Sequence, residues 1–196
     1  MTLSGLIVPP GEGRTLSTPA QHVTFKVTGE HTTTASTFEV VVPPGFDVGA
    51  HTHGRAEELF YLLEGELDVL AFEPEVRTAD SWHGWRSADG RRAVRATPGT
   101  LMLVPPGCPH AFANLSGRPA RLLFQVAPPT YHETYFEELM AILGTGGPVD
   151  HEAIAQLRIR YDIEQITPLR HDAAAREEGA DVRDEAGAPR GTGTTP

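Results

Sequence analysis

Short apolar runs, each ended by glycine or proline, are the feature that most restricts how this chain can fold. These runs are rich in Val, Phe, Leu and Thr, which favour a pleated and half-buried surface. Separation by turn-forming residues, among 20 glycines and 17 prolines, predicts many short strands and an all-β fold. The expected strands are 22–28, 36–42, 58–63, 66–72, 100–104, 109–113 and 120–126.

The periodicity changes near residue 130. Apolar residues recur at helical spacing in 131–143 and again in 150–161, with a glycine-rich link at 144–148 between them. Asp150 stands where an N-cap is expected. The sequence therefore predicts two C-terminal helices that pack on the outside of the β-structure.

Two segments depart from the strand pattern. Segment 73–98 contains Trp82 and Trp85 among turn residues, which predicts an extended excursion rather than a second domain. Either its tryptophans pack locally, or the excursion is a lid or a subunit contact. Segment 166–196 contains few large apolar residues, so we expect one domain at 1–165 followed by a disordered tail.

Charge and composition exclude several classes of protein. The formal net charge of −10 disfavours binding to a phosphate backbone, so no nucleic-acid partner is expected. No apolar stretch approaches the ~20 residues of a membrane span. Cys108 is the single cysteine, so no intramolecular disulfide forms. The N-terminal residues do not resemble a signal peptide, and a cytoplasmic location is expected.

A group of metal-binding residue types stands out. His51 and His53 are two residues apart, so in an extended segment both imidazoles project to the same face. Glu58 follows after a turn at Gly54, and His110 lies far along the chain in a strand–turn–strand segment. Three imidazoles and one carboxylate are suitable ligands for Fe, Mn, Co, Ni, Cu or Zn. The expected cofactor is one divalent metal ion per chain.

The spacing of these residues resembles the two sequence motifs of the cupin superfamily. The first is Gly45-x5-His51-x-His53-x4-Glu58-x6-Gly65, and the second is Gly99-x5-Pro105-x-Gly107-x2-His110-x3-Asn114. Two long patterns in the right order are a specific signal. Over roughly 5–165 the chain is similar to small single-domain cupins of the quercetin-dioxygenase-like group. This resemblance implies a double-stranded β-helix, also called a jelly-roll barrel, and places the metal ligands at His51, His53, Glu58 and His110.

Other residues receive smaller roles. Phe60, Met102 and Phe112 are expected to form the walls of a substrate pocket, because small barrels fill their interior except around a ligand. Cys108 is interpreted as a small hydrophobic residue. The remaining six histidines show no ligand spacing. A surface position is expected for His83, and no role is assigned to His22, His31, His132, His151 and His171.

The resemblance implies a metal-dependent dioxygenase that acts on a small enolisable or hydroxylated aromatic molecule. Iron is the first expected metal, and Glu58 is both a ligand and the catalytic proton acceptor. Two alternatives stay open: a non-oxidative metal-dependent cyclase or isomerase, and a small-molecule-binding protein without turnover. A homodimer is expected by analogy with other cupins.

Overall fold

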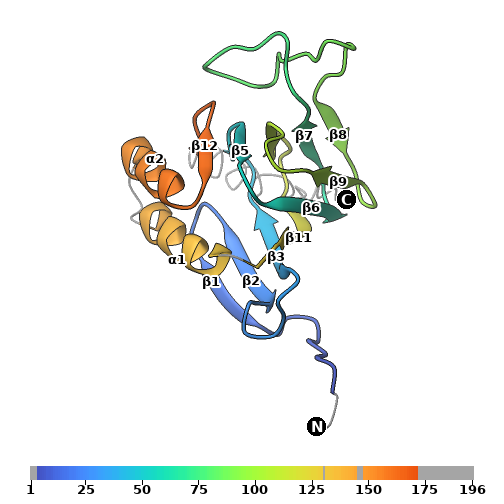
Figure 1. Cartoon of the computed structure of the whole chain (residues 1–196), viewed down its shortest axis with the longest axis vertical. Coiled ribbons are helices and arrows are strands. Elements are labelled where there is room, and N and C mark those ends of the chain that lie inside the picture. Colours follow the sequence, from blue (N-terminus) through green and yellow to red (C-terminus); the bar gives the residue numbers. More distant parts are fainter. Residues whose placement is uncertain (1–3, 130, 145–147, 172–196) are drawn as a thin grey trace, which may run out of the picture.

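The computed structural model describes residues 4–129, 131–144 and 148–171 (Figure 1). One antiparallel sheet has the strand order β1-β2-β3-β11-β6-β9. Its strands are β1 (Arg14–Ser17), β2 (His22–Val27), β3 (Ser36–Val42), β11 (Ala120–Ala127), β6 (Glu57–Glu64) and β9 (Leu101–Val104). The connection from β3 to its neighbour β11 spans most of the domain, so strands distant in sequence lie side by side.

The second sheet has the order β12-β5-β10-β4-β13, and β7 and β8 extend it beside β10. Its strands are β12 (Ile163–Gln165), β5 (His51–His53), β10 (His110–Ala113), β4 (Phe46–Asp47), β13 (Arg170–His171), β7 (Leu67–Ala71) and β8 (Val94–Ala96). Among the described residues the two sheets do not close into a continuous barrel. The predicted jelly-roll architecture is confirmed, but as two facing sheets rather than a closed barrel.

Helices α1 (His132–Leu143) and α2 (His151–Arg160) pack beside the sheets, as predicted (Figure 1). The Asp150 side chain caps α2 by accepting a hydrogen bond from the amide of Ala153 at 2.9 Å. Most of the link between the helices, 145–147, lies outside the described residues. Neither helix is both long enough and apolar enough to cross a membrane.

All seven predicted strands are present, each within one residue of its expected ends. The strands that the sequence did not predict are two to four residues long, as in β4 and β5. Such short segments contain too few residues to show a period of two. They form because the neighbouring long strands supply hydrogen-bond partners.

The core between sheet and helix is aromatic. Phe38 of β3 stacks on Phe124 of β11 with ring centroids 5.6 Å apart. Phe136 of α1 meets the edge of Phe38 at 5.1 Å. All three side chains are buried, and burying one such ring stabilises the fold by about 1.5–3 kcal/mol. This contact packs α1 against the six-stranded sheet.

The 73–98 excursion is packed against the domain. Trp82 and Trp85 are both fully buried. The Trp82 indole donates to Asp47 Oδ1 at 2.8 Å, and the Trp85 indole donates to the carbonyl of Thr78 at 3.1 Å. The structure therefore favours local packing of the tryptophans. They present no exposed aromatic surface for a lid or subunit contact.

The prediction that 166–196 is a disordered tail is wrong for residues 166–171. Leu169 is 1% exposed, and the Thr167 hydroxyl accepts a hydrogen bond from the amide of Ala50 at 2.8 Å. Strand β13 pairs with β4. A single leucine and a two-residue strand leave no recognisable pattern in the sequence. Residues 172–196 lie outside the described residues.

The replacement Leu169→Ala tests whether 166–171 belongs to the folded domain. We expect it to lower the free energy of unfolding by about 2–5 kcal/mol, because a fully buried leucine leaves a cavity. Leu115→Ala, at a side chain that is 56% exposed, is the matched control and should change it by less than about 0.5 kcal/mol. Equal effects in urea denaturation would place Leu169 outside the core.

Candidate metal centre

Four side chains from three strands converge inside the domain. His51 and His53 come from β5, Glu58 from β6 and His110 from β10, and all four are buried. One ligand atom from each lies within 4.8 Å of every other. His110 lies directly opposite His51 in the β5–β10 pair. Strand pairing therefore brings together residues that are far apart in sequence, as the resemblance to the cupin motifs implied.

A tight backbone turn before β5 orients His51. Gly49 has φ +71°, and a Cβ there would lie 2.3 Å from the carbonyl oxygen of Thr167, so only glycine fits. The Gly49 carbonyl oxygen is 2.9 Å from His51 Nδ1. A carbonyl can only accept, so Nδ1 carries the proton and Nε2 is left with its lone pair.

The same arrangement occurs at His110, whose Nδ1 is 3.1 Å from the carbonyl oxygen of Cys108. This contact leaves His110 Nε2 as the free nitrogen. Hydrogen bonds of this kind hold a metal-ligating imidazole in one tautomer and orientation. Cys108 contributes through its backbone, in keeping with the minor role predicted for its thiol.

The free nitrogen atoms fit a metal ion. His53 Nε2 and His110 Nε2 lie 3.1 and 3.0 Å from the two carboxylate oxygens of Glu58. Neither contact has hydrogen-bond geometry, so both buried nitrogen atoms lack a hydrogen-bond partner. Buried polar atoms without partners are costly. A cation between these groups would satisfy the lone pairs of both nitrogen atoms and the charge of the carboxylate together.

Burial and neighbouring groups shift the pKa values of three cluster residues towards the protonation states that bind a metal at neutral pH. Burial lowers the pKa of His51 well below its usual value and lowers that of His53 to about 4. Burial by itself would raise the pKa of Glu58, but the neighbouring imidazoles of His53, His110 and His132 hold it well below its usual value. Neutral imidazoles and an ionised carboxylate are the protonation states that metal ions require.

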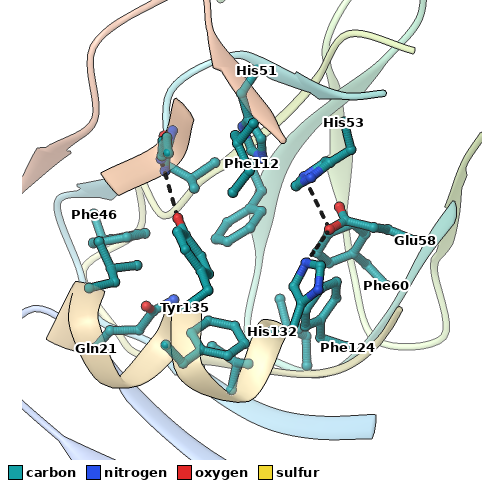
Figure 2. A pocket seen from close by; sticks show the side chains of 17 residues that line it. Gln21, Phe46, His51, His53, Glu58, Phe60, Phe112, Phe124, His132 and Tyr135 are labelled. Carbon is teal, nitrogen blue, oxygen red and sulfur yellow. Dashed lines mark hydrogen bonds and ion pairs between the residues drawn. The ribbon is translucent and has the colours of Figure 1, made fainter. Parts of the chain in front are cut away.

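A narrow cavity of about 50 Å³ adjoins the cluster (Figure 2). Phe60 and Phe112 line it, as predicted. Met102 does not: it lines a second cavity of about 20 Å³, which Phe60 and Phe112 also line. The two rings therefore border both cavities. The remaining walls are mainly apolar and come from both sheets and both helices.

Four polar residues in this cavity were not predicted as site residues: Gln21, His132, Tyr135 and Arg158. The Nε2 of His132 lies 3.5 Å from Glu58 Oε1 (Figure 2). The sequence did contain one signal for His132, because it is four residues before Phe136 and so shares the buried face of α1. None of the other histidines without ligand spacing lines the cavity.

The model of the cupin family matches residues 9–144. The chain belongs to the cupin family. An uncharacterized protein of Methanocaldococcus jannaschii, MJ1618, is 28% identical over 95 residues, which are 48% of this chain and 62% of that protein. The chain therefore matches less than two thirds of the length of this curated relative.

Solved cupin-like structures are similar in fold only. KdgF from a Halomonas species has 16% identity and a TM-score of 0.49, over 64% of this chain and 94% of that one. Lactobacillus farciminis oxalate decarboxylase has 21% identity and a TM-score of 0.45, over 60% and 32%. The Streptomyces nucleoside dehydratase Pac13 has 16% identity and a TM-score of 0.43, over 64% and 83%. Membership of the quercetin-dioxygenase-like group stays a prediction.

Replacing ligands should remove the metal from this cupin without unfolding it. We expect His51→Ala combined with His110→Ala to reduce bound metal from about one ion per chain to a background level, because two of four ligands are lost. His151→Ala, at an exposed position on α2, is the matched control and should keep its metal. Full metal content in the double variant, by elemental analysis, would contradict the assignment.

The metal-free protein should lose stability as the pH falls from 7 to 5. The pKa of His53 is about 4 in the folded state and about 6.5 in the unfolded chain. The unfolded chain therefore binds more protons in this range, and stability decreases towards low pH by up to about 1.4 kcal/mol per pH unit for such a group.

In urea denaturation of chelator-treated protein, His53→Gln should reduce this pH dependence and His151→Gln should leave it unchanged. An equal slope in wild type and His53→Gln would show that His53 is not buried in its neutral form.

Proposed function

We propose that this cupin is a metal-dependent dioxygenase that acts on a compact enolisable or hydroxylated molecule with a planar, aromatic or otherwise apolar body. The observation that carries the proposal is the buried cluster of three imidazoles and one carboxylate beside an aromatic cavity. Its cofactor is one divalent ion held by His51, His53, Glu58 and His110, with iron as the first candidate.

The bound metal supplies a Lewis acid, and iron, manganese, cobalt, nickel or copper also supplies redox chemistry that zinc lacks. Nitrogen-rich sites with one carboxylate suit these first-row ions better than magnesium or calcium. The identity of the bound metal therefore distinguishes oxidative chemistry from purely Lewis-acid chemistry. The protein residues contribute by binding and orienting the substrate and by moving a proton.

Glu58 and His132 are the residues placed for proton transfer. The Glu58 carboxylate is ionised and buried beside the cavity, so Oε1 is a base within reach of a bound hydroxyl or acidic C–H. His132 Nε2, 3.5 Å away, is placed to receive this proton from Glu58 or to stabilise the protonated carboxyl by hydrogen bonding. His132 thereby adds a second titratable group to the acceptor predicted from sequence.

The cavity limits the size and shape of the substrate. A volume of about 50 Å³ accommodates about four water-sized groups, far fewer than a flavonol with three rings contains. Phe60 and Phe124 stack on each other at 4.9 Å and form one wall. Such a wall favours a flat, compact molecule over a flavonol.

The contact between Glu58 and His132 also favours a second function, a non-oxidative isomerase or cyclase. Removing a proton at one carbon and returning it at another requires an acid–base pair and a Lewis acid, but no dioxygen. Both functions use the same residues, so the requirement for oxygen distinguishes them. In either case the substrate is compact.

The test is oxygen consumption by protein reconstituted separately with Fe²⁺, Mn²⁺, Co²⁺, Ni²⁺, Cu²⁺ and Zn²⁺. The panel includes 2,4-pentanedione and catechol as compact candidates and quercetin as an oversized one. We expect oxygen uptake with a compact compound and a redox-active metal, and none with zinc. Product formation at equal rates under anaerobic conditions supports the isomerase. Binding without any conversion indicates a binding protein.

His132→Gln tests the proton-transfer role separately from metal binding. We expect bound metal to stay at about one ion per chain, because His132 is outside the four-ligand cluster, while turnover falls by about 10²–10⁴-fold. His31→Gln, on an exposed turn, is the matched control. Loss of metal in His132→Gln, or unchanged turnover, would contradict the role.

A further inference from the structure

We propose that the substrate carries a carboxylate group, and that Arg158 binds this group at the end of the cavity away from Glu58. The inference rests on the proposed function in one respect, that the cavity beside the metal cluster is the substrate site. It adds the chemical class of the substrate, a small hydroxy- or oxo-carboxylate.

Arg158 is a charged side chain inside the domain. It extends from α2, lines the cavity and is 1% exposed. Its Nε donates to the Tyr135 hydroxyl at 3.2 Å, and both Nη atoms donate to the carbonyl oxygen of Val48 at 3.3 Å. Both partners of the guanidinium are neutral.

These contacts do not satisfy the arginine. A guanidinium has five N–H donors, and the three hydrogen bonds leave two donors without a partner among the described residues. No carboxylate of the described part of the chain forms an ion pair with Arg158, whereas Arg160, two residues further on, pairs with Glu138 at the surface. A buried charge without a counter-charge costs several kcal/mol. A ligand carboxylate would supply both the charge and the missing acceptors.

The arrangement of polar groups gives the cavity two distinct ends. Figure 2 shows Gln21 and Tyr135 on one side, Glu58 and His132 on the other, and the ring of Phe112 between them. Gln21 is 4% exposed, and its Oε1, a hydrogen-bond acceptor without a partner, is available to a ligand O–H or N–H group but not to a carboxylate. A molecule with a carboxylate at one end and a hydroxyl or enolisable carbon at the other matches both ends.

A purely structural role for Arg158 is the competing explanation. In that role it would join α2 to the Val48 carbonyl, and neither its charge nor its two remaining donors would have a function. The two explanations differ in ligand binding, because only the proposed role requires discrimination between a charged carboxylate and an uncharged group of the same shape.

The experiment measures binding of matched carboxylate and amide probes to the full-length, metal-loaded protein by calorimetry. The probes are glycolate, 3-hydroxypropionate and 4-hydroxybutyrate, each with its amide. We expect at least one carboxylate to bind about 10-fold or more tightly than its amide, as a charge-assisted hydrogen bond provides. Equal affinity within every pair would overturn the proposal.

Variants assign the preference to Arg158. In Arg158→Gln the preference should disappear through loss of carboxylate affinity, with amide affinity and bound metal unchanged, while Arg160→Gln should behave as wild type. An undiminished preference in Arg158→Gln would show that the carboxylate binds elsewhere, for example to the metal. If circular dichroism shows that Arg158→Gln is unfolded, the variant Arg158→Lys tests the proposal instead. A threefold or greater loss of carboxylate affinity in Arg158→Lys supports the proposal, since the planar fork is lost, and unchanged affinity overturns it.

This readout is independent of turnover. A carboxylate preference without any oxygen uptake or isomerisation would remove the proposed reaction and leave the binding role of Arg158 in place. Turnover of uncharged compounds without a carboxylate preference would leave the proposed reaction in place and remove the binding role of Arg158.

Discussion

The approach of three imidazoles to one carboxylate in the protein interior is the interaction on which the structure of this cupin depends. Groups of this kind are costly to bury unless they are satisfied. Here two imidazoles donate from Nδ1 to backbone carbonyls, those of Gly49 and Cys108. The lone pairs of Nε2 are thereby directed at a common position beside Glu58. The backbone thus sets the orientation of the ligands, and a cation completes their coordination.

The rest of the fold secures these positions. Strand β5 is only three residues long, yet it is hydrogen-bonded on one side to β10 and on the other to β12. The Thr167 hydroxyl holds the amide of Ala50, directly before His51. Strand β12 and Thr167, far along the chain, therefore hold His51 and His53 in place. Changes near 163–171 should reach the metal centre through the backbone of β5.

Much of the candidate site could be predicted from the sequence, because its four ligands stand in the two spaced motifs that resemble those of the cupin superfamily. Residues two apart on a strand must share a face, so His51 and His53 follow from spacing, and the motif around His110 locates the fourth ligand. The long strands were equally clear. Strands β12 and β13 were not, since two or three residues show no periodicity.

What the sequence could not provide is the position of the helices relative to the sheets. Spacing reveals which residues share a helix face, but not which cavity this face covers. His132, Tyr135 and Arg158 reach the site only because α1 and α2 pack where they do. Met102 shows the converse: its strand was predicted, but its side chain lines a second cavity, which shares Phe60 and Phe112 with the first. Tertiary packing, which pattern alone does not encode, decided these cases.

A compact substrate beside a cation, a proton acceptor at one end and a buried guanidinium at the other form a consistent chemical description. Its central claim is the identity of the ligands. The most direct test is a crystal structure of protein purified without added metal, with diffraction recorded across the absorption edge of the metal found in it. We predict one anomalous peak about 2.0–2.2 Å from an imidazole nitrogen of His51, His53 and His110 and from a carboxylate oxygen of Glu58. A metal bound elsewhere, with these four side chains hydrogen-bonded to one another or to water, would contradict the account.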